Sequence, residues 1–287
     1  MSVNGFVRST LVAVTLPATL ALSGCFFEDP QHDPSGLAIG APATNEPFDD
    51  YVKKTSEQLR SALKSKRFDQ EAAPFGQYNL DQVVAMRAPF ATGPDKAACD
   101  AAGNDTAHGR DVGFLMVHGL TDSPFLMTDI RDTLTSKFPC ATFHGVLLPG
   151  HGTVPGDLLD VTYEEWIETV RYGMDGFTDG TDHIITIGYS MGAALIGREF
   201  DARRRDPRMT AMVLLSPGFS AKSDQAWLTP YARYVQSWVG QGENSDAAKY
   251  GSMAMNAAAE FHLLTEPYRN GTMDAFDIPV FMVVSSD

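Results

Sequence analysis

A serine between two glycines stands where a β-branched run of the sequence gives way to small residues. The stretch reads IITIGYSMGAAL, residues 184–195, and the serine is Ser190. A G-x-S-x-G pattern between a strand and a helix makes a tight turn that strains the serine backbone and presents its Oγ above the sheet edge. A hydroxyl held in this way can attack an acyl carbon. The five-residue pattern alone is weak evidence for a catalytic serine, so the residues around it decide the interpretation.

The residues on both sides of Ser190 fit a strand, a turn and a helix. Gly188 and Gly192 fit because side chains there would collide with the neighbouring helix and strand. A helix that begins directly after the serine favours negative charge at its N-terminus. That environment suits the anionic oxygen of an acyl-transfer intermediate.

Two turns upstream support the same chemistry. HGLTDSP, residues 118–124, follows a strand-like run that ends at Val117, and LPGHG, residues 148–152, ends the next one. A backbone N–H of the first turn can pair with the amide of Met191 to form an oxyanion hole. The three segments together predict a serine hydrolase.

In this order and at these separations, HGLTDSP, LPGHG and GYSMGAAL resemble the α/β-hydrolase superfamily, especially its bacterial carboxylesterase and monoacylglycerol lipase branch. The resemblance spans residues 112–287. It implies Ser190 as the nucleophile and Leu120 and Met191 as the two oxyanion-hole donors. It also implies attack on an ester carbonyl, an acyl-enzyme and hydrolysis by water. No metal and no organic cofactor are expected.

The acid and the base of the site are harder to assign. The family order is Ser, then Asp or Glu, then His, so the resemblance makes Asp287 the acid unless the residue after it has that role. His118 and His151 are expected to be structural, and His262 precedes the last predicted strand. None of the three is the expected base.

No histidine follows Asp287 in the sequence. A serine without its base loses most of its nucleophilicity, so we expect the 287-residue chain by itself to be nearly inactive. We interpret the chain as a C-terminally truncated hydrolase that lacks the final strand and helix. The alternative is a degenerate hydrolase kept as a non-catalytic, surface-binding lipoprotein.

From Val112 onward, strand-like and helix-like segments alternate, and these elements must position the residues named above. Continuous apolar strands separated by amphipathic helices predict an α/β fold with a mostly parallel sheet and helices on both faces. The run at 82–90 is compatible with an early strand. The predicted strands are 112–117, 141–148, 183–188, 210–216 and 278–284, and the predicted helices are 48–66, 123–138, 162–177 and 190–205.

Residues 217–276 interrupt the alternation. Aromatic residues recur there at spacings of four, three and four, which predicts one helix with a single aromatic stripe: Trp227, Tyr231, Tyr234 and Trp238. Such a stripe is more often core than binding surface. The insertion is expected to form a cap over the site.

The N-terminus has the pattern of a secretory signal. Arg8 precedes an apolar stretch at 11–22 that is too short to span a bilayer. LSGC, residues 22–25, resembles the lipobox of bacterial lipoproteins, which implies cleavage before Cys25 and its lipidation. The alternative is an ordinary signal peptide. Phe26 implies sorting to the outer membrane, facing the periplasm, in an enterobacterium-like host.

The predicted organisation follows from these boundaries. Residues 1–24 are the signal peptide, and 25–47, rich in Pro, Gly and Ala, are a flexible tether. Residues 48–287 are the hydrolase domain, including the cap. In an oxidising compartment a disulfide between Cys99 and Cys140 is expected, because their segments lead into neighbouring strands; two separate thiols are the alternative.

The composition limits the partners. The chain has 22 basic and 36 acidic residues, a formal net charge of −14, which would repel a phosphate backbone and excludes nucleic acid as a partner. The expected substrate is a small acyl ester. A serine peptidase or thioesterase on the same fold stays open as an alternative, since fold and nucleophile do not set the substrate.

Overall fold

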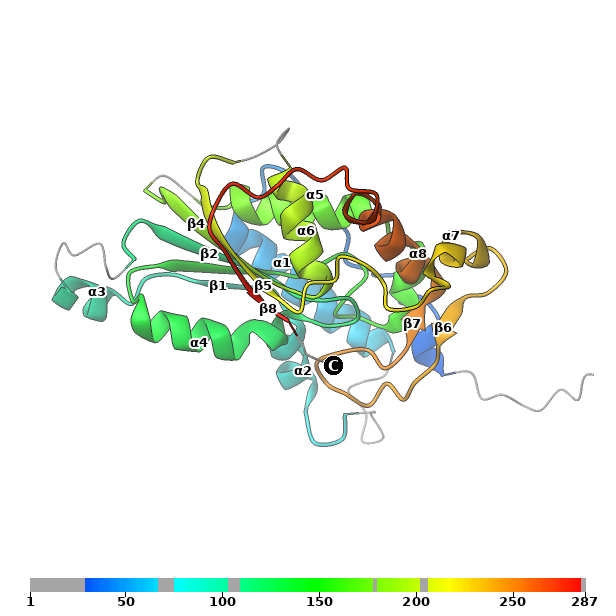
Figure 1. Ribbon diagram of the computed structural model, residues 1–287. Coiled ribbons are helices and arrows are strands. Elements are labelled where there is room, and N and C mark those ends of the chain that lie inside the picture. The colour runs from blue at the N-terminus through cyan, green and yellow to red at the C-terminus, as the bar shows by residue number, and fades with distance from the viewer. Residues whose placement is uncertain (1–28, 67–74, 103–108, 178–179, 202–205, 285–287) are drawn as a thin grey trace, which may run out of the picture.

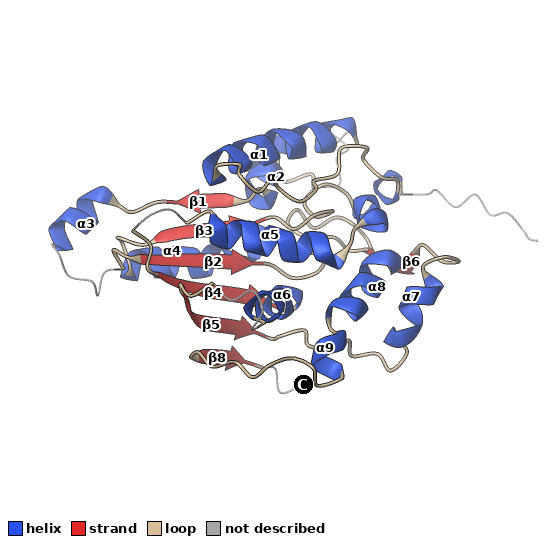
Figure 2. Cartoon of the chain, turned by 90° about the horizontal axis from the view of Figure 1, so that it is seen from above, coloured by secondary structure: helices blue, strands red, loops and turns tan. Residues whose placement is uncertain are grey.

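The computed structural model describes residues 29–66, 75–102, 109–177, 180–201 and 206–284. Its centre is a six-stranded sheet in the order β1-β3-β2-β4-β5-β8 (Figures 1 and 2). The strands are β1 Phe90–Thr92, β2 Val112–Val117, β3 Thr142–Val146, β4 His183–Tyr189, β5 Met209–Leu215 and β8 Val280–Val283. All neighbouring pairs are parallel except β1 and β3. The predicted α/β fold is confirmed.

Helices cover both faces of the sheet, which explains why its central strands are apolar on both sides. Leu115 and Val117 of β2 pack in a core with α1 Phe48–Ser65, α5 Tyr163–Asp175 and α6 Met191–Phe200. Phe114 and Met116 point the other way and pack against α4 Thr128–Lys137. Side chains of a strand alternate between faces, so one apolar run serves both layers.

Two predicted elements, one before β1 and one after it, differ from the structure. The run at 82–90 belongs mainly to α2 Leu80–Arg87, and only Phe90 enters β1. Pro89 disfavours helical backbone at Ala88, so the helix stops there. The helix predicted over 123–138 divides into a 3-10 turn, Pro124–Met127, and α4. The sequence places Phe125 and Leu126 on one apolar stripe of this helix, but both side chains are exposed.

The segment predicted as a flexible tether is packed in its described part. Residues 25–28 lie outside the described residues, but 29–47 run along the body. Ile39 is buried and its carbonyl accepts the amide N–H of Gly150 at 3.0 Å. Ser35 donates from N and Oγ to the carboxylate of Asp157, at 2.7 and 2.6 Å. Hydrogen bonds and two buried side chains, Gln31 and Ile39, hold this segment, and its composition gives no sign of them.

The insertion at 217–276 folds into short elements beyond the carboxyl ends of the strands (Figure 1). They are a 3-10 turn Ala226–Leu228, α7 Thr229–Ala232, β6 Trp238–Gly240, β7 Met253–Ala254, α8 Met255–Leu264 and α9 Glu266–Arg269. The single helix predicted for the aromatic residues is wrong, because the helical turn ends at Ala232. The prediction that they are core is wrong as well, since Trp227, Tyr231 and Tyr234 are exposed.

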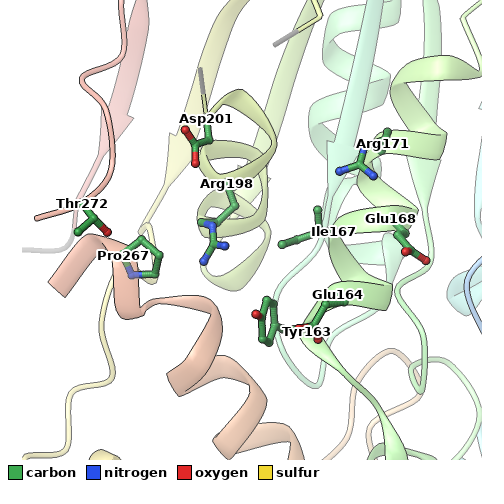
Figure 3. Close-up of a pocket in the computed structure, with 9 residues that line it drawn as sticks. All are labelled: Tyr163, Glu164, Ile167, Glu168, Arg171, Arg198, Asp201, Pro267 and Thr272. Atoms are coloured by element: carbon green, nitrogen blue, oxygen red, sulfur yellow. The ribbon is translucent and has the colours of Figure 1, made fainter. Parts of the chain in front are cut away.

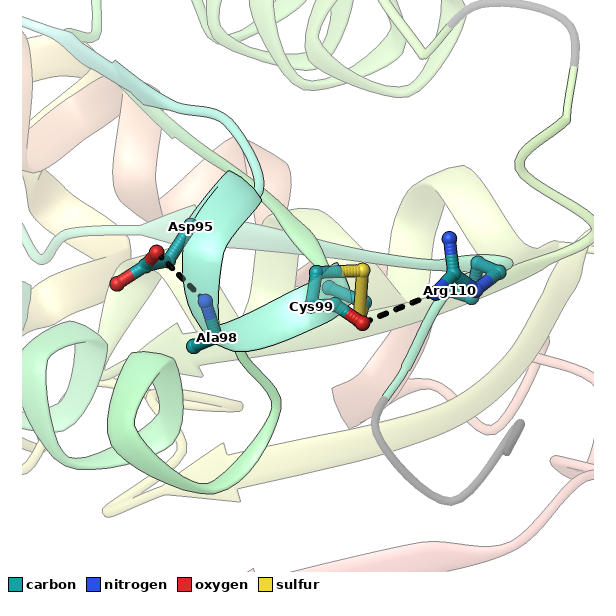
Figure 4. The surroundings of a disulfide bond; sticks show 5 residues. Asp95, Ala98, Cys99 and Arg110 are labelled. Atoms are coloured by element: carbon teal, nitrogen blue, oxygen red, sulfur yellow. Dashed lines mark hydrogen bonds between the residues drawn. A yellow bond between two sulfur atoms is a disulfide. The ribbon is translucent and has the colours of Figure 1, made fainter. Parts of the chain in front are cut away.

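A disulfide joins Cys99 on α3 Lys96–Ala102 to Cys140, with Cα atoms 5.0 Å apart (Figure 4). The carbonyl of Cys99 also accepts a hydrogen bond from Arg110, just before β2. Cys140 lies just before β3, and β2 and β3 pair in parallel. The bridge therefore ties α3 to the start of β3, and the Arg110 hydrogen bond ties α3 to the start of β2. In the described part of the chain, no helix has the length and apolarity needed to cross a bilayer.

Candidate active site

Ser190 occupies the sharp turn between β4 and α6. Its backbone has φ 51° and ψ −113°, a left-handed conformation that costs a non-glycine residue on the order of 1–3 kcal/mol. Hydrogen bonds hold it there: Ser190 donates its N–H to the carbonyl of Leu215 at 2.9 Å, and its own carbonyl accepts the N–H of Gly218 at 2.9 Å. The strand before the turn, the next strand and the first cap residues together fix the serine.

The two glycines of the pattern are required by close backbone contacts. A Cβ on Gly188 would lie 2.6 Å from the backbone N of Ala193 in α6. A Cβ on Gly192 would lie 2.6 Å from the carbonyl oxygen of His118 and would overlap that of Val117. Helix α6 thus rests directly on the end of β2. This is why the serine pattern and the HGLTDSP turn lie side by side.

The expected oxyanion-hole residues lie next to the serine. A Cβ on Gly119 would be 3.3 Å from the Cβ of Ser190, so the turn contacts the serine directly. Met191 is the first residue of α6, where an amide has no acceptor within its helix. Within the described ranges, neither the Leu120 nor the Met191 amide donates a hydrogen bond. Both are available to an anionic oxygen.

A cavity of about 690 Å³ opens above Ser190. Leu120 and Ser190 lie at its base, and the cap supplies most of its walls. Apolar side chains dominate, with a few polar groups such as Lys222 and Gln236. A small apolar cavity with the serine at its base can hold the acyl part of a ligand next to the hydroxyl.

The two histidines of the upstream turns hold these turns together. His118 Nε2 accepts the N–H of Leu148 at 3.1 Å, and His151 Nε2 accepts the N–H of Thr121 at 3.2 Å. Each ring donates from Nδ1 to a carbonyl of its own turn, at Gly119 and Pro149. Both nitrogens of each ring are therefore in use.

Burial keeps both rings neutral. It lowers the pKa of His118 well below 6.5, with a further contribution from His151, and it lowers the pKa of His151 to about 4. Neither side chain lines the cavity. Their expected structural role agrees with this geometry, since a ring that accepts an amide N–H cannot also receive a proton from Ser190.

The remaining histidine considered from the sequence, His262, lies on α8 and outside the cavity lining. Arg269 donates to its Nε2 at 3.1 Å, while its Nδ1 is buried and has no partner among the described residues. Burial first, and Arg269 second, lower its pKa. Of the histidines in the described residues, none lines the cavity with Ser190. Asp287 and Cys25 lie outside the described residues.

A second cavity, of about 500 Å³, lies between α5, α6 and α9 (Figure 3). Its two arginines have partners: Arg171 binds Glu199 through two hydrogen bonds at 3.0 and 3.1 Å, and Arg198 donates to the carbonyl of Leu264. Among its lining residues there is no nucleophile with a neighbouring base. The larger cavity above Ser190 is the candidate active site.

Sequence reasoning missed Arg87, a fully buried guanidinium at the end of α2. It donates to the carbonyls of Gly152 and Thr153, next to the LPGHG turn, and to that of Ala247 before β7. Burial lowers its pKa, and the backbone carbonyls replace its water. It connects the turn to the cap, and no local pattern identified it.

Comparison with known proteins agrees with this arrangement. Residues 114–278 match a model described as the alpha/beta hydrolase family. The chain belongs to the alpha/beta hydrolase family. None of the curated protein sequences compared with it gives a significant match.

Solved structures similar to this alpha/beta hydrolase include one described with LipS and LipT, two metagenome-derived lipolytic enzymes. It is 16% identical, with TM-score 0.54, over 69% of this chain and 76% of that one. A monoacylglycerol lipase of Paleococcus ferrophilus is 12% identical, with TM-score 0.46, over 69% and 88% of the two chains. A monoglyceride lipase of Saccharomyces cerevisiae is 11% identical, with TM-score 0.48, over 68% and 71%. At these identities the likeness concerns the fold.

Proposed function

We propose that this alpha/beta hydrolase cleaves carboxylic esters through an acyl-enzyme on Ser190. The observation that carries the proposal is the strained Ser190 at the base of an apolar cavity, with the free amides of Leu120 and Met191 beside it. Preorganised amides stabilise the charge that develops on the carbonyl oxygen, and each is typically worth about 3–4 kcal/mol in the transition state.

In the first step, Oγ of Ser190 bonds to the carbonyl carbon and the carbonyl electron pair moves onto its oxygen. The Leu120 and Met191 amides hold that oxyanion. The serine proton passes through a base to the leaving alcohol as the ester C–O bond breaks. In the second step a water molecule repeats the attack, which releases the acid and restores Ser190. Asp287 stays our proposed acidic residue of the site, and its carboxylate would orient the base.

Hydrolysis of p-nitrophenyl esters with short or medium acyl chains by the complete protein tests the proposal. We expect turnover that Ser190→Ala abolishes. Ser216→Ala is a matched control, because Ser216 also has a left-handed backbone, at φ 43°, but does not line the cavity. Unchanged turnover in Ser190→Ala would exclude Ser190 as the nucleophile.

We also propose that Cys25 carries a lipid anchor and places the protein on the outer membrane, facing the periplasm. The LSGC motif after a short apolar stretch supports this. Mass spectrometry of the N-terminal peptide of protein extracted from membranes is expected to show an acylated Cys25. An unmodified thiol at that residue would exclude the anchor.

A further inference from the structure

The cap carries an exposed apolar patch, here called the aromatic patch: Trp227, Leu228, Tyr231, Tyr234, Val235 and Val239. Its side chains are among the most exposed apolar ones, with Trp227 at 58%, Tyr231 at 70%, Tyr234 at 78% and Val235 at 88%. Large exposed apolar patches on a protein mark surfaces that bind another molecule or a membrane. The patch is therefore a candidate binding surface.

The patch borders the entrance to the Ser190 cavity. Leu228 and Val239 belong to the patch and also line the cavity. Ala232 and Gln236, which alternate with patch residues along the chain, line it too. A surface on which the patch rested would therefore lie next to the cavity wall, and an apolar ligand could pass from one to the other.

The N-terminal segment is attached to the same end of the molecule. The ring of His32 packs at a tilt against that of Trp238, with the ring centres 4.3 Å apart, and its Nε2 shares a hydrogen bond with Ser252 Oγ at 2.9 Å. Asp29 Oδ2 accepts a hydrogen bond from Asn244 at 2.9 Å. Trp238 lies three residues after Val235, so this attachment is adjacent to the patch in sequence.

The attachment limits where a lipid at Cys25 can reach. Cys25 precedes Asp29 by four residues, which span at most about 14 Å when extended. An anchor on so short a lead would hold the cap, rather than the opposite end of the molecule, against the bilayer. The packed segment 29–47 thus acts as a strap that orients the protein.

We propose that the aromatic patch lies on a lipid bilayer, with the Ser190 cavity opening toward it, so that the ester substrate enters from the membrane. Trp and Tyr prefer this environment, because their rings are apolar and their N–H or O–H groups remain in the polar headgroup layer. The choice of an ester and the lipid on Cys25 rest on the proposed function, whereas the patch, its place beside the cavity and the packing of 29–47 are observed in the structure.

The charges at the patch favour a neutral lipid surface over an acidic one. Arg233, between Tyr231 and Tyr234, is paired with Glu260, and its guanidinium lies 5.4 Å from the ring centre of Tyr234. The chain as a whole carries a net charge of −14. Contact with phosphatidylcholine should therefore need no anionic lipid and should change little with salt.

Quenching of tryptophan fluorescence by brominated lipid tests the orientation without any need for turnover. The lipid-anchored protein is reconstituted into vesicles of phosphatidylcholine with bromine on its acyl chains. Of the three tryptophans, Trp166 is fully buried and Trp227 is exposed in the patch. We expect bromine to reduce the emission, and Trp227→Phe to remove most of that reduction.

A matched control moves the reporter to the far end of the molecule. Ala101 is exposed on α3, which lies opposite α7 and β6 in both views (Figures 1 and 2). In the double variant Trp227→Phe with Ala101→Trp, we expect no quenching of the new tryptophan. Equal quenching at both sites, or none at Trp227, would overturn the orientation. A patch-dependent dimer with an unquenched Trp227 would assign the patch to a second copy instead.

Activity provides an independent comparison. Tyr231→Ser is expected to lower hydrolysis of an ester embedded in vesicles while leaving hydrolysis of a soluble p-nitrophenyl ester unchanged, because Tyr231 does not line the cavity. An equal loss on both substrates would contradict the role of the patch. Loss of all hydrolysis in the unmodified protein would refute the proposed function but not the quenching result.

Discussion

His118 and His151 bind each other's turns: each ring accepts an amide N–H from the turn that carries the other, at 3.1 and 3.2 Å, and the ring centres are 5.0 Å apart. Thr121, whose amide His151 holds, directly follows Leu120. The reciprocal pair therefore fixes the backbone that presents one of the two amides beside Ser190. It depends on both rings being neutral, which their burial ensures.

Acidification should weaken this pair. Burial lowers the pKa of His151 to about 4 from 6.5, so between these values the unfolded chain binds the proton and the folded chain does not. The contribution of His151 to the free energy of unfolding is complete above about pH 6.5 and is lost as the pH falls toward 4. Burial also lowers the pKa of His144 to about 4, so its contribution to stability is lost over the same pH range. Burial raises the pKa of Asp122 to about 6, so protonation of Asp122 favours the folded chain as the pH falls and opposes the effect of the histidines.

The difference between variants isolates the His151 contribution. His151→Asn keeps an acceptor without a titrating ring, so urea unfolding of this variant should depend less on pH between 6.5 and 4 than unfolding of the unmodified protein. His183→Asn, at an exposed position, is the control. Identical pH profiles for His151→Asn and the unmodified protein would show that His151 does not titrate in this way.

The close contact of α6 with the end of β2 should make Gly192 intolerant of a side chain. Gly192→Ala places a Cβ against the carbonyl oxygens of Val117 and His118, so we expect the free energy of unfolding to fall by about 1–3 kcal/mol. Displacement of Ser190 should abolish ester hydrolysis as well. Gly40→Ala, with open space around its Cα, is the control and should be neutral. Equal stability of the two variants would contradict the packing.

The disulfide between Cys99 and Cys140 should stabilise the domain by restricting the unfolded chain. Its cysteines are 41 residues apart in sequence, which corresponds to about 4 kcal/mol in the chain-entropy account. We expect Cys99→Ser with Cys140→Ser, or a reductant, to lower the unfolding midpoint in urea. A reductant that has no effect on the unmodified protein, together with two free thiols after denaturation, would show that the bridge is not formed.

Local patterns predicted the parts of the structure whose signals are local. The strand before Ser190, the two glycines and the apolar runs of β2, β4 and β5 follow from spacing and size, because buried strands and close backbone contacts restrict the residue types allowed. The amide of Met191 was predicted from the turn after Ser190, whereas the choice of Leu120 within the HGLTDSP turn came from the family resemblance. Neither periodicity nor composition required Leu120.

What the sequence did not reveal depends on distant contacts. The packing of 29–47 rests on partners such as Asp157 and Asn244, more than 100 residues away. The guanidinium of Arg87 is held by carbonyls of two separate loops. The aromatic residues of the cap kept a helical spacing although the helix ends at Ala232, so their spacing predicted a buried stripe where the structure has an exposed patch.

The most direct test of the central claim is the covalent trapping of Ser190. The complete protein is treated with a fluorophosphonate, digested and analysed by mass spectrometry. We predict an adduct on the peptide that contains Ser190, and no adduct in Ser190→Ala. An unlabelled Ser190 in protein that hydrolyses esters, or an adduct on another residue, would contradict the assignment of Ser190 as the nucleophile.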